Sequence, residues 1–249
     1  MQITILGSGT GIPTLARNAA GLLIRIEKEN LLFDTGPGIL RRLLEKGITY
    51  HDIDYIFYTH FHTDHTLDLA SVLFAAKYAL SLRTKKLDII GPQGLERFYN
   101  SLLDLYGDVI RPEAYEINLR EIEEQTLQLP AYKIKTLRMQ HSPESIGYRV
   151  ESKGKVVVYS GDTDVCENVV KLGRGCDLLI LDCSFPQEMK VKGHLTAREA
   201  AEVARECNCK RLVLSHLYPV CRQDEISRQA KKAFKGEISV AYDLMNITL

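Results

Sequence analysis

The sequence predicts an α/β fold in which two β-sheets pack face to face and helices cover both outer faces. Two observations lead to this prediction. Short apolar or β-branched runs of strand length recur along the whole chain, and they alternate with longer segments of helical pattern. Both kinds of segment occur in each half, and no linker rich in proline, glycine or serine separates the halves. We therefore expect residues 1–249 to form a single domain.

The first half is predicted to begin with strands and to continue with strands and helices in alternation. Each strand is a mainly apolar run, and each helix follows a glycine or a polar turn. The expected strands are 2–6, 21–26, 30–33, 53–58 and 87–90, and the expected helices are 38–46, 67–82 and 95–106. Residues 7–19 are expected to form a loop, and the more polar stretch 113–129 is expected to hold short strands.

The second half repeats this mixture. Its expected strands are 133–137, 147–151, 155–159, 178–181 and 212–214, its expected helices are 165–173, 197–207 and 225–234, and 238–249 is expected to hold two closing strands. The apolar faces of the strands need cover, which two packed sheets with helices outside would provide. Side chains from both halves would then meet at one edge of the sandwich.

A block of metal-binding side chains follows the predicted strand 53–58. His60, His62, Asp64 and His65 fall within six consecutive positions, and neutral imidazole is the commonest metal ligand in proteins. Residues two apart in an extended segment point the same way, so His60 and His62 can bind one ion. Asp64 and His65 open the next helix and can face a second ion. One zinc ion takes about four ligands, so a two-metal site needs further donors.

Three further donors stand at the ends of predicted strands. His141, Asp162 and His216 each follow a short apolar or β-branched run. Strand ends at one edge of a sheet are the usual place for binding and catalysis on an α/β scaffold. The three residues are therefore predicted ligands of the same centre. His194 begins a helix rather than ending a strand, which indicates a different role.

Simpler structural roles exist for each residue taken alone. An isolated His141 or His216 is more often a hydrogen-bonded histidine than a ligand. Asp64 and Asp162 stand where an aspartate often caps a helix or closes a turn. The block of three histidines outweighs these alternatives for the whole set. His51 lacks this context and is expected in a solvated turn.

The charge balance limits the possible partners. Lys plus Arg and Asp plus Glu both total 32, so any RNA contact would need a local basic patch instead of a general electrostatic attraction. The six cysteines include no Cys-x-x-Cys pair, and no apolar run reaches the length of a membrane helix. A cytoplasmic protein with reduced cysteines is the simplest expectation.

The N-terminal glycines invite comparison with a nucleotide-binding loop. The spacing of Gly7, Gly9 and Gly11 does not match Gly-x-Gly-x-x-Gly, and Pro13 continues a loop where a helix should begin. We therefore expect this loop to line the metal site instead.

These motifs together resemble the metallo-β-lactamase superfamily, and specifically its ribonuclease Z-like branch. The block from His60 to His65 is similar to the central motif of the superfamily. The segments similar to those of the branch are Leu6-Gly7-Ser8-Gly9-Thr10 with Ile12-Pro13-Thr14 and Arg17-Asn18, Leu32-Phe33-Asp34-Thr35-Gly36-Pro37-Gly38, Ile90-Gly91-Pro92-Gln93-Gly94-Leu95, Ser160-Gly161-Asp162-Thr163 and Gly193-His194-Leu195-Thr196. The resemblance covers nearly the whole chain, and it implies an αββα four-layer sandwich of two mixed sheets with helices on both outer faces.

The resemblance also implies a role for each candidate residue. The seven implied metal ligands form two sets that share Asp162: His60, His62 and His141 for one ion, and Asp64, His65 and His216 for the other. Asp34 would orient a ligand imidazole through a hydrogen bond. His194 would lie outside the metal shell near the leaving group, and His194 and Asp64 make up the catalytic set. The implied cofactors are two divalent ions, zinc first, with manganese or iron as alternatives.

The leading functional prediction is a dinuclear metal-dependent hydrolase of phosphodiesters, in which a metal-bridging hydroxide attacks phosphorus. The expected partner is a phosphodiester substrate, small molecule or RNA, and the branch favours a homodimer. Ribonuclease Z enzymes carry a long flexible arm that grips tRNA, expected here between positions 141 and 162, which are only 21 apart. The arm is therefore predicted to be absent, which argues against the first alternative, tRNA 3′-processing. An arylsulfatase- or lactonase-like ester hydrolase is the further alternative.

Overall fold

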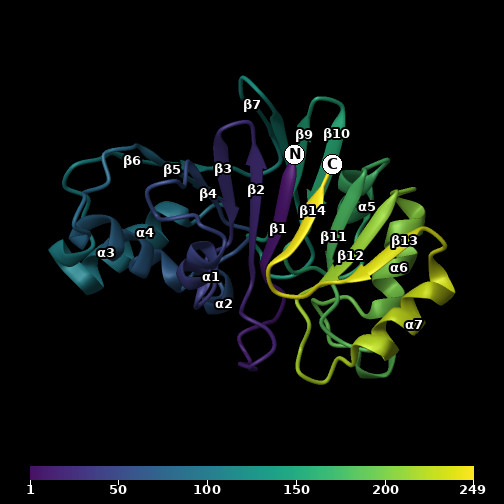
Figure 1. Cartoon of the computed structure of the whole chain (residues 1–249). Helices are drawn as coiled ribbons and strands as arrows, with labels where there is room; N and C mark the ends of the chain where they lie inside the picture. Colours follow the sequence, from purple (N-terminus) through teal and green to yellow (C-terminus); the bar gives the residue numbers. More distant parts are fainter.

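Two seven-stranded sheets pack face to face, and helices lie on both outer sides (Figure 1). The computed structural model describes all residues, 1–249. Each sheet is antiparallel on one side and parallel on the other. The predicted αββα sandwich of two mixed sheets is therefore confirmed.

The first sheet comes almost entirely from the first half of the chain. In spatial order it consists of β14 (Met245–Thr248), β1 (Gln2–Gly7), β2 (Gly21–Ile26), β3 (Glu29–Phe33), β4 (Tyr55–Phe57), β5 (Leu87–Gly91) and β6 (Ile117–Glu121). Its outer face is covered by α1 (Ile39–Glu45), α3 (Asp68–Tyr78) and α4 (Leu95–Tyr106). A single turn, α2 (Thr63–Thr66), precedes α3, and a 3-10 turn, Gly107–Val109, follows α4.

The second sheet comes from the second half. In spatial order it consists of β13 (Glu237–Val240), β12 (Arg211–Ser215), β11 (Leu178–Asp182), β10 (Lys155–Tyr159), β9 (Ile146–Ser152), β8 (Lys133–Arg138) and β7 (Thr126–Gln128). Its outer face is covered by α5 (Glu167–Gly173), α6 (Ala197–Glu206) and α7 (Gln223–Ala233). A 3-10 turn, Gln187–Met189, lies between β11 and α6.

Every predicted strand and helix is present, and the largest difference is the end of α3. The helix ends at Tyr78, not at residue 82, because Ala79 is extended. The cause lies beyond the helix, in a fully buried arginine. Arg83 donates hydrogen bonds to the carbonyl oxygens of Tyr50 and Ile53, on the segment before β4. This tertiary anchor draws the chain away from the helix axis.

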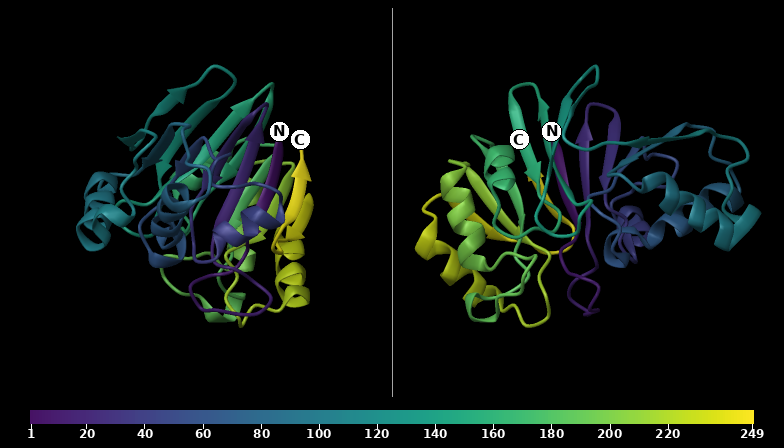
Figure 2. Two further views of the ribbon diagram at one scale, coloured as in Figure 1. Left: turned by 60° about the vertical axis from the view of Figure 1, so that its left-hand side comes forward. Right: turned by 180° about the vertical axis from the view of Figure 1, so that it is seen from behind.

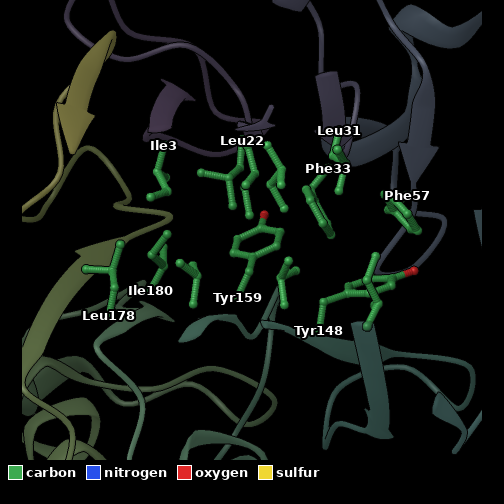
Figure 3. Packing of buried hydrophobic residues seen from close by; sticks show 14 of the residues in the cluster. Ile3, Leu22, Leu31, Phe33, Phe57, Tyr148, Tyr159, Leu178 and Ile180 are labelled. Atoms are coloured by element: carbon green, nitrogen blue, oxygen red, sulfur yellow. The ribbon is translucent and has the colours of Figure 1, made fainter. Parts of the chain in front are cut away.

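The main core lies between the sheets. Figure 3 shows Ile3, Leu22 and Phe33 of the first sheet pointing toward Tyr148 and Tyr159 of the second. The rings of Phe33 and Tyr148 stand edge to face with their centroids 5.2 Å apart, a favourable aromatic geometry. The alternating apolar residues of both sheets thus fix how the two halves meet.

One edge of the sandwich collects the carboxyl ends of strands from both sheets. β3 and β4 are parallel, as are β10, β11 and β12, and these strands all end at the lower edge in Figure 1, beside the loop between β1 and β2. The two termini lie side by side at the opposite end (Figure 2). No helix is long and apolar enough to cross a lipid bilayer.

Candidate metal centre

All seven predicted ligands converge on one point, with Asp162 at its middle. The two oxygens of this carboxylate face different groups of imidazoles. Asp162 Oδ2 lies 3.8 Å from His60 Nε2 and 3.6 Å from His141 Nε2. Asp162 Oδ1 lies 3.3 Å from His65 Nε2 and 3.4 Å from His216 Nε2. The shared carboxylate is therefore placed between two sets of donors.

The remaining two predicted ligands complete these sets. His62 Nδ1 lies 3.1 Å from His141 Nε2, and Asp64 Oδ2 lies 3.4 Å from His216 Nε2. Ligand atoms at zinc bond lengths and tetrahedral angles stand about 3.3 Å apart. Three groups of donor atoms each have all their atoms within 4.8 Å of one another: His60, His62, His141 and Asp162; Asp64, His65 and His216; and Asp162, Asp182, His194 and His216. The first two groups are the two predicted ligand sets.

Unsatisfied buried atoms give an independent test of whether metal ions fit. His60 Nε2 and Asp162 Oδ1 are both buried and accept or donate no hydrogen bond. Buried polar atoms without a partner are rare in folded proteins, because each has lost its hydrogen bonds to water, which costs about 1–3 kcal/mol of folding free energy. Cations bound to the two sets would satisfy both atoms, so the residues fit a pair of metal ions.

A buried network around Asp34 orients the first ligands. Asp34 Oδ2 accepts a hydrogen bond from His65 Nδ1 at 2.8 Å and another from the hydroxyl of Tyr159 at 2.9 Å. The Thr59 hydroxyl donates to the same carboxylate, so its oxygen is free to accept from His60 Nδ1, 3.0 Å away. Both imidazoles thereby present Nε2 to the centre, the orienting role expected of Asp34.

The second half orients its own two imidazoles in the same way. His141 Nδ1 donates to the carbonyl oxygen of Gly193 at 2.9 Å. The amide of Gly193 in turn donates to Asp164 Oδ2 at 3.0 Å, which fixes that loop. His216 Nδ1 lies 3.0 Å from the hydroxyl oxygen of Ser184. Four ligand imidazoles thus have Nδ1 held and Nε2 turned inward.

The electrostatics favour the ligand forms of three of these groups and oppose that of His65. Burial would lower the pKa of His65, but the carboxylates of Asp162 and Asp34 outweigh it and raise that pKa well above its usual value, so an ion would have to displace a proton from this ring. Burial, helped by the nearby imidazole of His65, lowers the pKa of His60 well below its usual value, so this ring is neutral. Burial alone would raise the pKa of Asp162, but the imidazoles of His216 and His65 outweigh it and hold that pKa well below its usual value. Burial also opposes ionisation of Asp64, yet the hydrogen bond with His216 lowers its pKa. Neutral imidazoles and ionised carboxylates are the forms that bind metals.

His194 lies beside the two sets and belongs to neither of them. Its Nδ1 is 2.8 Å from Asp182 Oδ2 and 4.0 Å from Asp162 Oδ2, while its Nε2 has no hydrogen-bond partner. Burial lowers its pKa, but the Asp182 carboxylate outweighs burial, and the net shift is upward. His194 stands before the helix instead of beginning it, because Thr196 is the N-cap residue of α6.

Asp182 and Ser184 are functional candidates that the sequence analysis missed. Asp182 ends β11, and its side chain is fully buried. Besides His194, it accepts a hydrogen bond from the Ser184 hydroxyl at 2.6 Å, and Ser184 contacts His216. The rule that identified Asp162, a carboxylate at the end of an apolar strand, applies equally to Asp182. Ser184 carries no comparable signal in the sequence.

The loop between β1 and β2 lies against the centre, as expected for its glycines. The Gly11 amide donates to Asp64 Oδ2 at 2.9 Å. At the base of the loop, Asp243 accepts hydrogen bonds from the amides of Ser8 and Asn18. The seventh histidine, His51, lies in a turn outside the centre, with its Nε2 3.3 Å from the Ser81 hydroxyl.

Comparison with known sequences identifies a family for most of the chain. Residues 29–217 match the family model described as a beta-lactamase superfamily domain. The ribonuclease Z of Methanosarcina acetivorans is 31% identical, with 100% of this chain and 98% of that protein covered. That alignment runs over 302 positions, more than the 249 residues of this chain, so the relative contains insertions that this chain lacks.

Solved structures show the same fold. The metallo-beta-lactamase fold protein YhfI from Bacillus subtilis superposes with a TM-score of 0.88 at 23% identity, over 99% of this chain and 98% of that one. The short form of human tRNase Z superposes with a TM-score of 0.81 at 28% identity, over 100% of this chain and 99% of that one.

Proposed function

Because the chain belongs to the metallo-β-lactamase superfamily, in its ribonuclease Z-like branch, we propose that it is a metal-dependent hydrolase of phosphodiesters with a two-ion centre. The observation that carries the proposal is the position of Asp162. Its two oxygens face separate groups of imidazoles at 3.3–3.8 Å, as a ligand shared by two ions requires. The proposal treats the whole chain as one domain, since both sheets supply ligands.

The two ligand sets define where each ion would bind. One ion would be held by His60, His62, His141 and Asp162, and the other by Asp64, His65 and His216 together with Asp162, whose Oδ1 faces the last two of these. Imidazole and carboxylate ligands suit zinc, and they also accept manganese and iron. When bound, the two ions would supply an activated water nucleophile and neutralise the negative charge that develops on the phosphoryl group.

His194 is placed to act as the general acid. The Asp182 carboxylate binds Nδ1 and raises the pKa of His194 against the effect of burial, which favours the protonated ring. The proton on the unpartnered Nε2 then passes to the alkoxide oxygen of the leaving group as its bond to phosphorus breaks. Such a proton transfer contributes about 10²–10⁴-fold to a rate. Asp182 fixes the ring so that this proton points toward the substrate.

Small or exposed phosphodiesters are the preferred substrate class. Between the ligands His141 and Asp162 the chain forms only the hairpin of β9 and β10, closed by Lys153 and Gly154, both with positive φ. Positive φ at two successive residues is typical of a tight hairpin turn. No arm projects between these two ligands, and the formal net charge is zero.

Endonucleolytic tRNA 3′-processing is the second candidate. Curated relatives that align over the full chain carry the name ribonuclease Z, and this observation favours the candidate. This chain would then have to bind tRNA without the arm. An ester hydrolase acting on aryl sulfates or lactones is the third candidate, because the same ions can polarise those bonds.

A substrate panel on metal-defined protein tests the proposal. Zinc-loaded protein is assayed against bis(p-nitrophenyl) phosphate, a pre-tRNA with a 3′ trailer, an aryl sulfate and a lactone. We expect hydrolysis of the phosphodiester, and we expect Asp162→Ala and His60→Ala to reduce bound metal in elemental analysis. The matched control is His51→Ala, a histidine outside the centre, which should keep both metal and activity. Preferential cleavage of pre-tRNA would support the second candidate, and hydrolysis of only the sulfate or lactone would overturn the proposal.

Two further expectations stay predictions. A homodimer would appear as a particle of twice the 28.1 kDa chain mass in sedimentation equilibrium. A cytoplasmic location would be seen by cell fractionation.

A further inference from the structure

Two aromatic side chains stand beside the general acid and have no role in the proposed chemistry so far. Phe185 follows β11, and Tyr218 follows β12. Their rings are stacked, with centroids 4.5 Å apart and planes inclined by 24°. The ring centroids lie 6.1 Å and 6.2 Å from that of His194. This inference rests on the proposed function, because the general acid marks the side on which the leaving group departs.

The backbone fixes both rings in place. Phe185 forms a bridge with Thr196, and its carbonyl oxygen accepts from the Ala197 amide at 3.2 Å. The Tyr218 amide approaches the carbonyl oxygen of Ser184 at 3.4 Å. Both segments therefore pack onto residues that hold His194 and His216. The pair has a fixed position relative to the centre, and binding to it would order few additional side chains.

Both rings keep solvent-accessible surface, and each is only half-buried. The Tyr218 hydroxyl makes no hydrogen bond with another residue. The phenol hydroxyl is therefore a donor without an acceptor in the protein. A half-buried ring with a free polar tip is suited to a ligand that is both flat and polar.

From this geometry we propose that Phe185 and Tyr218 form a platform for a planar ring in the leaving group of the substrate. The ring packs against the aromatic pair, and the Tyr218 hydroxyl donates a hydrogen bond to a polar atom of the same group. A nucleobase and a substituted phenol share this chemistry. The substrate class is then a phosphodiester in which the alcohol next to His194 carries an aromatic ring.

Binding of isolated leaving groups tests the platform without any turnover. Saturation-transfer NMR with zinc-loaded protein is carried out with adenosine, p-nitrophenol and ribose as probes. We expect transfer to the aromatic protons of the first two probes and none to ribose. Stacking on an aromatic side chain is worth roughly 5–150-fold in affinity, so Tyr218→Leu and Phe185→Leu should weaken binding about tenfold or more. Binding of only one aromatic probe identifies the ring type.

A matched control exists on α3. Phe74 and Tyr78 form another aromatic pair, with centroids 4.6 Å apart, and are 49% and 54% exposed. Tyr78→Leu should leave the binding of adenosine and p-nitrophenol unchanged. Equal loss of binding in Tyr78→Leu and Tyr218→Leu would mean that the probes bind nonspecifically, and it would overturn the platform.

Kinetics with a pair of substrates tests the platform in catalysis. Thymidine 5′-phosphate is esterified with either adenosine or methanol, and kcat/KM is measured for both esters from the release of thymidine 5′-phosphate, so that only departure of adenosine or methanol is counted. In Tyr218→Leu the preference for the adenosine ester should fall about tenfold. Tyr218→Phe keeps the aromatic ring and disturbs folding less. In this variant the preference for the adenosine ester should fall by a smaller factor, because only the hydroxyl is lost. An equal decrease for both esters would reduce the pair to a structural support of His194 and would overturn the inference. If wild-type protein hydrolyses neither ester, the proposed function fails, while the NMR result still decides the platform.

Discussion

Two aspartate–histidine pairs, one at a strand end of each sheet, have different roles. Asp34 follows β3 in the first sheet and holds His65, and Asp182 ends β11 in the second sheet and holds His194. The distance between Nδ1 and Oδ2 is 2.8 Å in both pairs. Both carboxylates are fully buried, but the His65 side chain is 0% and the His194 side chain 11% exposed.

The difference between the pairs lies in the second nitrogen of each ring. His65 Nε2 faces Asp162 and His216 inside the centre, so it is available only to an ion. His194 Nε2 faces no protein partner, so it is available to a substrate. An aspartate at the end of a strand thus fixes an imidazole equally well for ligation or for proton transfer, and the surroundings of Nε2 decide between the two.

Removal of the acid imidazole should have the largest effect. In His194→Ala we expect turnover to fall by about 10²–10⁴-fold, because no group remains to protonate the leaving alkoxide. Bound metal should stay at the wild-type level, since His194 belongs to neither ligand set. Steady-state kinetics and elemental analysis of the same preparation check both halves of the expectation. Loss of metal together with activity would mean that the Asp182–His194 pair supports metal binding, as the Asp34–His65 pair does.

Removal of the Asp34 carboxylate should lower the stability of the protein as well as its metal affinity. Asp34→Ala leaves His65, Thr59 and Tyr159 without their buried acceptor. Breaking a buried charged pair from one side costs about 3–5 kcal/mol of unfolding free energy. Loss of the group that orients a ligand typically weakens metal affinity about 10–100-fold. Urea unfolding and metal titration measure the two effects, and a loss under about 1 kcal/mol would contradict the buried network described here.

A conservative change at Asp182 should separate the orientation of His194 from the binding of metal. In Asp182→Asn the amide keeps the size of the side chain but no longer stabilises a protonated His194. We expect turnover to fall about 10–100-fold, the usual range for loss of an orienting group. A smaller loss of metal is expected through Ser184 and His216. If metal affinity fell more than turnover, Asp182 would resemble Asp34 in function, and the contrast would disappear.

The smallest effect is expected at the helix cap next to the acid. Thr196 and Glu199 form a capping box at the start of α6, and loss of an N-cap hydroxyl typically costs about 1 kcal/mol. Thr196→Ala should therefore lower the unfolding free energy slightly in a thermal or urea denaturation curve. Turnover and metal content should change less than in Asp182→Asn. A larger loss of turnover would show that the position of His194 depends on the helix and not on the carboxylate.

The sequence predicts the fold well because local pattern and burial agree. Each apolar run became a strand, and the interval between His141 and Asp162 became a hairpin. The predicted end of α3 is wrong because Arg83, just beyond the helix, donates hydrogen bonds to the backbone carbonyls of Tyr50 and Ile53. Such an anchor depends on tertiary contacts and leaves no periodic pattern in the sequence.

For a related reason, the sequence predicts some residues of the site and not others. The seven proposed ligands were found because histidines are few and their spacing is informative, and Asp34 came from the family resemblance. Asp182 was overlooked because it continues the apolar run of β11. Phe185 and Tyr218 look like ordinary loop aromatics in the sequence, and only the folded chain brings them beside His194.

The pairing of β1 with β14 has a consequence for the nascent protein. Thr4 pairs with Asn246, so β1 leaves the ribosome long before β14, the strand that covers its edge. Synthesis at about 5–20 residues per second makes this delay on the order of tens of seconds. During that time β1 presents an open edge to other chains. Translation speed and chaperone occupancy therefore bear directly on the yield of this protein, and a chain that stalls before Met245 would expose that edge permanently.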